Sequence, residues 1–127
     1  MINDLKISVV IPTFNEEKSI KKLIQSLITQ TFIVDEIIIS DARSNDKTLE
    51  IIKEFIKSNI NIKYAQRNGF CRGAGRNAGI ISASNETIAL IDAGSFPEKN
   101  WLENLISNYH SHDDIIFGAV RPIFKNL

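Results

Sequence analysis

Two kinds of hydrophobic pattern alternate along this chain of 127 residues, and the alternation restricts the possible folds more than any other feature. Short, continuous apolar runs rich in β-branched residues are typical of strands that are buried on both faces. Such runs lie at residues 7–11, 36–39, 60–64, 87–91 and 115–120. Between them, apolar residues recur with the spacing of one helix face. This order predicts an α/β fold, a Rossmann-like and mostly parallel sheet with helices on both faces.

Helices are expected where the apolar stripes lie, at residues 20–28, 49–56 and 101–109, with a shorter and weaker helix over 73–82. Pro12 lacks an N–H and is expected to end the first strand. Asn15 and Asp46 are expected to cap the helices that follow them, and Ser95 to open a capping box before the last helix. No repeat or linker interrupts the chain, so we expect residues 1–127 to form one domain.

Charge and composition exclude several classes of protein. Lys plus Arg and Asp plus Glu each total 15, so the chain lacks the basic excess of a nucleic-acid binder. No run reaches the ~18 apolar residues of a membrane helix, and the first residues do not form a signal peptide. The single cysteine, Cys71, fits a reducing compartment and has no nearby histidine to activate it as a nucleophile. We therefore expect a cytoplasmic chain without a transmembrane segment.

Polar, compact residues follow four of the expected strands or lead into the next helix, at 12–16, 41–46, 72–77 and 92–95. In an open parallel sheet, ligands bind beyond the carboxyl ends of the strands. For Asp41 we favour hydrogen bonds to a base or a ribose over a role in a turn, whereas capping alone explains Asp46. Asp92 closes the fourth run, where a carboxylate can bind ribose or a divalent cation, although a turn role stays open.

Arg67, Arg72 and Arg76 surround a glycine-rich turn, and guanidinium groups suit phosphate oxygens. For Arg67, a solvated basic loop is an equally good interpretation. A dinucleotide-binding glycine motif would normally follow the first strand, but residues 13–17 contain no glycine, which disfavours a nicotinamide or flavin enzyme. A phosphoacceptor receiver domain is disfavoured as well, because no acidic pair follows the first strand.

Taken together, these segments resemble the inverting glycosyltransferases of family two, which have the GT-A fold. Residues 9–17 are similar to the start of that family, and residues 36–48 are similar to its "DDGSTDGT" segment. Residues 73–79 look like its "GxxxARNxG" segment, and residues 87–94 stand where its DxD motif stands. The four segments occur in the family's order and spacing and cover nearly the whole chain.

The resemblance implies a domain that binds a nucleotide-diphosphate sugar, usually linked to UDP, for transfer to an acceptor hydroxyl with inversion. By the same resemblance, Thr13 and Glu16 line the nucleoside pocket, Asp41 binds the base, Arg76 lies near the base or diphosphate, and Asp92 contacts ribose or a Mn or Mg ion. The expected substrate-binding residues are Thr13, Glu16, Asp41, Arg72, Arg76, Asp92 and Ala93.

Two departures from the family pattern shape these expectations. Gly94 replaces the second DxD carboxylate, so Asp92 remains the candidate metal ligand and metal dependence should be weak. The acceptor site and the catalytic base are expected beyond Leu127, so this truncated span should bind a donor without transferring sugar. We expect a sugar or lipid-linked acceptor, a place at the inner face of a membrane, and self-association through the 115–120 segment. A non-catalytic nucleotide-sugar binding module remains the alternative.

Overall fold

The computed structural model describes residues 4–58, 61–69, 71–110, 112, 115–116, 118 and 120–121, and it leaves the side chain of Arg72 undescribed. The described chain forms a four-stranded parallel sheet in the order β3-β2-β1-β4. The strands are β1 (Ile7–Thr13), β2 (Glu36–Asp41), β3 (Ile62–Gln66) and β4 (Thr87–Leu90). The helices are α1 (Ile20–Ile28), α2 (Thr48–Ile56), α3 (Arg72–Ser82) and α4 (Trp101–Ser107). This arrangement confirms the predicted α/β fold.

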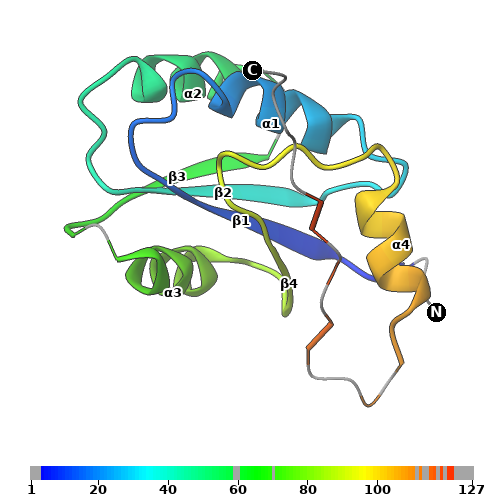
Figure 1. Ribbon diagram of the computed structural model, residues 1–127. Coiled ribbons are helices and arrows are strands. Elements are labelled where there is room, and N and C mark those ends of the chain that lie inside the picture. The colour runs from blue at the N-terminus through cyan, green and yellow to red at the C-terminus, as the bar shows by residue number, and fades with distance from the viewer. Residues whose placement is uncertain are drawn as a thin grey trace.

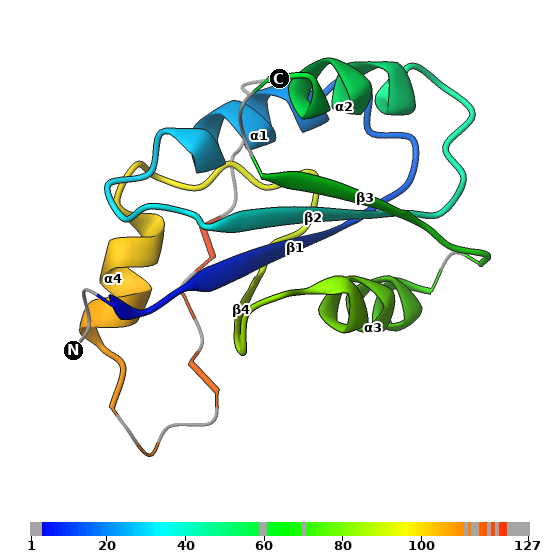
Figure 2. The same cartoon turned by 180° about the vertical axis from the view of Figure 1, so that it is seen from behind.

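The helices cover the sheet unequally: α1 and α2 lie over one face, and α3 lies over the other (Figures 1 and 2). The main core lies under α1 and α2, where alternate residues of the central strands, such as Ile11 and Ile39, are fully buried. β1 and β2 are buried along their whole length, as their continuous apolar runs predicted. α4 joins this core through Leu102 and Ile106.

On the opposite face, α3 lies unusually close to β1. A Cβ atom added at Gly79 would overlap the Val10 side chain, so only glycine allows this approach. The close packing places the first turn of α3 next to the carboxyl ends of the strands, which is where ligands bind in sheets of this kind.

Pro12 does not end the first strand, which corrects the expectation from the sequence. β1 continues to Thr13, and Pro12 pairs in register with Ser40 of β2. The main-chain oxygen of Val10 accepts a hydrogen bond from Ile91 on the β4 side. Pro12, two residues later, faces the same side at a point beyond the end of β4, so its missing N–H costs the sheet no bond.

Two expected helix caps are also wrong. α1 begins at Ile20, well after Asn15, and α4 begins at Trp101, well after Ser95. Asn15 has a φ of 50° and instead binds a neighbouring loop. Asp46 lies one residue before the N-cap position of α2, which Lys47 occupies, but its carboxylate does accept the main-chain N–H of Thr48, the first residue of that helix.

The expected strand at 115–120 falls partly outside the described residues. Residues 115, 116, 118 and 120 of this segment are described, and none of them lies in a strand. Self-association was expected from this segment and stays a prediction. Among the described residues, no helix has both the length and the apolar character needed to cross a membrane.

Candidate functional site

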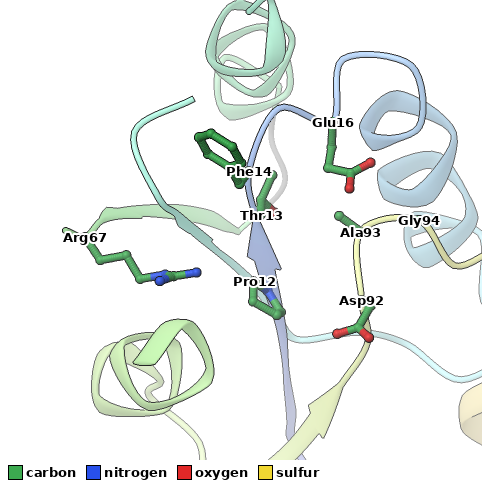
Figure 3. Close-up of a pocket in the computed structure, with 8 residues that line it drawn as sticks. All are labelled: Pro12, Thr13, Phe14, Glu16, Arg67, Asp92, Ala93 and Gly94. Carbon is green, nitrogen blue, oxygen red and sulfur yellow. The ribbon is translucent and has the colours of Figure 1, made fainter. Parts of the chain in front are cut away.

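A cavity of about 370 Å³ lies at the carboxyl ends of β1 and β4 (Figure 3). Successive strands are added on one side of β1 as far as β3, and the chain then crosses to place β4 on the other side. The junction between β1 and β4 is therefore the switch point at which open α/β sheets bind ligands. The residues that line the cavity are Pro12, Thr13, Phe14, Glu16, Arg67, Asp92, Ala93 and Gly94.

Four residues predicted from the sequence meet in this cavity: Thr13 at the end of β1, Glu16 in the loop after it, and Asp92 and Ala93 after β4. The Thr13 hydroxyl donates to the main-chain oxygen of Ile11 at 3.2 Å, which holds the end of β1. The Glu16 carboxylate accepts a hydrogen bond from the Ser19 hydroxyl at 2.6 Å. Asp41 and Arg76 do not line the cavity, and the side chain of Arg72 lies outside the described part of the chain.

Arg76 nevertheless reaches the site through Asp92. Its Nη2 lies 3.2 Å from Asp92 Oδ1, and this contact ties α3 to the loop that follows β4. Both side chains are about 40% exposed, so the pair contributes only about 0–1 kcal/mol to stability. Its more important effect is on charge, because Arg76 offsets the negative charge that Asp92 presents at the cavity.

The residues around Asp92 do not by themselves form a complete metal site. Mg²⁺ and similar hard cations need several oxygen ligands. Here Asp92 is paired with Arg76, and Gly94 has no side chain to contribute. Within the described part of the chain, no group of three or more His, Cys, Asp or Glu residues could hold a metal ion.

Asp41 is 1% exposed and is already bound within the protein. Its carboxylate accepts hydrogen bonds from the Ser44 N–H at 2.8 Å, from the Ser44 hydroxyl, and from the Tyr64 hydroxyl at 3.2 Å. Burial and the charge and hydrogen bond of Asp41 raise the pKa of Tyr64 to about 12, so this phenol stays protonated. The turn role of Asp41 therefore has a direct structural basis, and its contact with a base stays a prediction.

Reciprocal hydrogen bonds hold the loop after β1 against the loop after β2. The Asn15 N–H donates to the Ser44 hydroxyl at 2.8 Å, and the Asn45 N–H donates to Asn15 Oδ1 at 2.9 Å. The Glu16 N–H donates to the Thr48 hydroxyl at 2.8 Å. These bonds fix the main chain of Glu16 at the cavity, so this part of the site is preorganised.

Asp46 adds to the same loop contact. Its carboxylate accepts hydrogen bonds from the Thr48 hydroxyl and from the N–H groups of Thr48 and Glu17. Partial burial raises the pKa of Asp46, but these hydrogen bonds outweigh burial and lower it below its usual value. Asp46 therefore stays ionised and keeps both loops in place at neutral pH.

Arg67 is the cavity residue that the sequence left undecided. It directly follows β3, and its N–H donates to the main-chain oxygen of Asp41 at 2.8 Å. Its side chain reaches the cavity and points toward Pro12 (Figure 3). Its position directly after a strand could have indicated a binding-site residue. The direction of its long side chain could not be predicted, because it depends on packing against α3.

Comparison with known proteins gives a consistent result. The model of the family described as "Glycosyl transferase family 2" matches residues 8–127. A dolichyl N-acetyl-α-D-glucosaminyl phosphate glucuronosyltransferase of Methanococcus voltae is 37% identical over 107 residues, covering 81% of this chain and 33% of that protein. The poly(ribitol-phosphate) β-N-acetylglucosaminyltransferase TarS of Staphylococcus aureus is 32% identical over 126 residues, covering 94% of this chain and 22% of that protein.

Solved structures agree with the sequence comparison. S. aureus TarS 1–349 in complex with UDP is similar with a TM-score of 0.71 and 30% identity, over 81% of this chain and 31% of that one. The same protein has also been solved with UDP-GlcNAc. A Pyrobaculum calidifontis mannosyltransferase, solved with GDP-Man and Mn²⁺, shares the fold at a TM-score of 0.73 and 19% identity, over 82% of this chain and 32% of that one. The chain thus spans about a third or less of these proteins.

Proposed function

Because the chain belongs to glycosyl transferase family 2, we propose that its cavity binds the nucleotide part of a nucleotide-diphosphate sugar, with UDP as the nucleotide. The observation that carries the proposal is the convergence of Thr13 at the end of β1, Glu16 in the next loop and Asp92 after β4 at the switch point of the sheet. Carboxylates suit ribose hydroxyls as hydrogen-bond acceptors. The UDP and UDP-GlcNAc complexes of the similar TarS support the choice of nucleotide.

The lining residues suggest how the nucleotide would lie. Phe14 and Arg67 are on one side of the end of β1, and Asp92, Ala93 and Glu16 are on the other (Figure 3). We place the base on the side of Phe14, because bases stack favourably on aromatic rings. The ribose and diphosphate then lie toward Asp92, where Arg76 supplies a positive charge.

This arrangement supplies part of the chemistry of sugar transfer. Inverting transfer needs charge stabilisation on the leaving diphosphate and a base that deprotonates the acceptor hydroxyl. We assign the stabilisation of the leaving diphosphate to Arg76, whose guanidinium can exchange its contact with Asp92 for one with a phosphate oxygen. We assign the base and the acceptor site to residues beyond Leu127.

The acceptor and the cellular location belong to the same proposal. The M. voltae relative is named for a dolichyl-phosphate-linked sugar, and TarS for poly(ribitol-phosphate). We propose a sugar or lipid-linked acceptor and a cytoplasmic domain that works at the inner face of a membrane. A non-catalytic module that only binds nucleotide sugars is the second candidate, and a sugar-transfer assay on a longer chain would separate the two.

The test is a thermal-shift panel of UDP, GDP, CMP and dTDP sugars with these 127 residues, each with and without Mn²⁺. UDP sugars should raise the melting temperature in a concentration-dependent manner, because a ligand that binds only the folded state stabilises it. Mn²⁺ should add little, since Gly94 offers no ligand and Asp92 is paired. If no nucleotide sugar shifted the melting temperature, the proposed function would be rejected.

A further inference from the structure

Arg67 lies against Gly75 in the first turns of α3. The function proposed above does not account for this contact. A Cβ atom added at Gly75 would come within 2.7–2.8 Å of Nε, Nη2 and Cζ of the Arg67 guanidinium. The absence of a side chain at Gly75 therefore creates the space in which this guanidinium lies.

The guanidinium is held at one end and has unused hydrogen-bonding capacity. Its Nη1 donates to the main-chain oxygen of Gly69 at 2.6 Å, within a turn where Gly69 has a φ of 90°. Its Nε is buried without a hydrogen-bond partner. Within the described part of the chain, the other such side-chain atom is Ser40 Oγ.

Ser40 belongs to the same layer of the structure. It pairs in register with Pro12 and Ala65, so its side chain shares their face of the sheet, toward α3. Buried donors without partners are rare in folded proteins and call for a specific explanation. Nε itself is enclosed against α3, out of reach of a ligand, but the Arg67 side chain lines the cavity, so a ligand there can accept a hydrogen bond from the Nη groups of the guanidinium.

We propose that Arg67, seated against Gly75, donates a hydrogen bond to a carbonyl oxygen on the edge of the nucleobase and so selects keto bases. The contact meant is with O4 of uracil or O6 of guanine. Cytosine and adenine carry an amino group at the corresponding position, and a guanidinium, which has only donors, cannot pair with it, although cytosine keeps its other carbonyl at C2. This inference rests on the proposed function, because it places the base on the side of Phe14 and Arg67.

Charge and position favour a base over a phosphate at this point. Arg67 is on the opposite side of β1 from Asp92 (Figure 3), where Arg76 already provides a cation for the diphosphate. Its main chain is bonded to Asp41, at the end of β2. One nucleotide that spans the cavity would therefore meet Arg76 with its phosphates and Arg67 with its base.

Calorimetric titration with size-matched nucleotide pairs tests the proposal: UDP against CDP, and GDP against ADP. The natural chain should bind UDP about 5- to 150-fold more tightly than CDP, which is the discrimination that a good base-edge contact provides. Arg67→Met keeps most of the side-chain length and removes the donors, so the UDP to CDP ratio should fall close to one, mainly through weaker UDP binding.

Gly75→Ala provides a second variant that keeps Arg67 but displaces it. Alanine favours helix over glycine, and the clash involves only the flexible end of a side chain, so this variant should fold. Its UDP to CDP ratio should also fall. Gly73→Ala is the matched control, because a Cβ there meets only Cys71 Sγ, at 3.7 Å, and the ratio should not change.

Three results would overturn the inference while leaving nucleotide binding intact. The natural chain could bind UDP and CDP equally, Arg67→Met could weaken both to the same degree, as a phosphate contact requires, or Gly75→Ala could keep the full preference. Failure of the natural chain to bind any nucleotide would instead reject the proposed function, and this inference with it. Circular dichroism of each variant confirms that folding is unchanged.

Discussion

Glu36 is a buried carboxylate at the amino-terminal end of the sheet, far from the cavity, and it makes stability depend on pH. It is 1% exposed and forms an ion pair with Lys63. It also accepts hydrogen bonds from the Ser8 hydroxyl at 2.6 Å, from the Ser84 N–H at 2.8 Å and from the Ser84 hydroxyl at 3.0 Å. Replacing this carboxylate by an amide, Glu36→Gln, removes the charge at nearly constant size.

The pKa of Glu36 determines how much this carboxylate contributes to the free energy of folding. Burial raises this pKa, but Lys63 and the two serines outweigh burial and lower it from 4.5 to about 2. A shift of this size is equivalent to about 3 kcal/mol of folding free energy. Because the pKa is lowered in the folded state, the stabilisation is complete above pH 4.5 and disappears as the pH falls toward 2. Against a typical total of 5–15 kcal/mol, this is a large contribution.

Urea unfolding at several pH values between 7 and 2.5 measures this contribution. At neutral pH, Glu36→Gln should be less stable than the natural chain by about 3 kcal/mol, and the difference should shrink steadily below pH 4.5. Glu54→Gln, which changes an exposed glutamate on α2, is the matched control and should remain within about 0.5 kcal/mol of the natural chain. A difference between Glu36→Gln and the natural chain that stayed constant from pH 7 to 2.5 would refute the reasoning.

Three further predictions concern the site and its support. Asp41→Ala should lower the free energy of unfolding by about 2–4 kcal/mol, because it leaves donors of Ser44 and Tyr64 unpaired, and an unchanged urea midpoint would contradict this. Gly79→Ala should cost about 1–3 kcal/mol in the same assay through overlap with Val10, whereas Gly73→Ala should cost nothing. Asp92→Asn should change stability by less than about 1 kcal/mol, and a large Mn²⁺-dependent gain in UDP affinity that this variant abolished would show that a metal site exists after all.

Much of the fold followed from periodicity, and the exceptions have local causes. Runs that are buried on both faces have a distinctive composition, so β1 and β2 were predicted nearly to their true limits. The prediction that Pro12 ends β1 was wrong, because the cost of its missing N–H depends on the neighbouring strand. β4 ends before it reaches Pro12, so no sheet hydrogen bond is lost there. The prediction that Asn15 caps a helix was wrong, because an asparagine side chain can accept a hydrogen bond in a loop contact as well as at a helix N-terminus. Here Asn15 Oδ1 accepts the N–H of Asn45, and the sequence does not show that Asn45 lies beside it.

The site was predicted where position along the chain was sufficient. Thr13 ends a strand, Glu16, Asp92 and Ala93 follow one, and parallel strands bring their carboxyl ends to one edge of the sheet. The same rule selected Asp41 but could not show whether its carboxylate faces a ligand or the protein. That outcome depends on Tyr64 in a neighbouring strand, which places its hydroxyl 3.2 Å from the Asp41 carboxylate.

Arg67 shows why a specificity residue of this kind is hard to recognise in a sequence. An arginine after a strand suits a solvated loop as well as a binding site, and nothing in its immediate neighbours decides between the two. The deciding residue is Gly75, which acts by having no side chain and so lets the guanidinium lie beside the helix. The two residues depend on each other. Alanine at 75 would displace the arginine, and a shorter residue at 67 would leave the space beside Gly75 unfilled. Base selection in this cavity should therefore vary with the two positions together, and a variant altered at only one of them should lose the preference for a keto base.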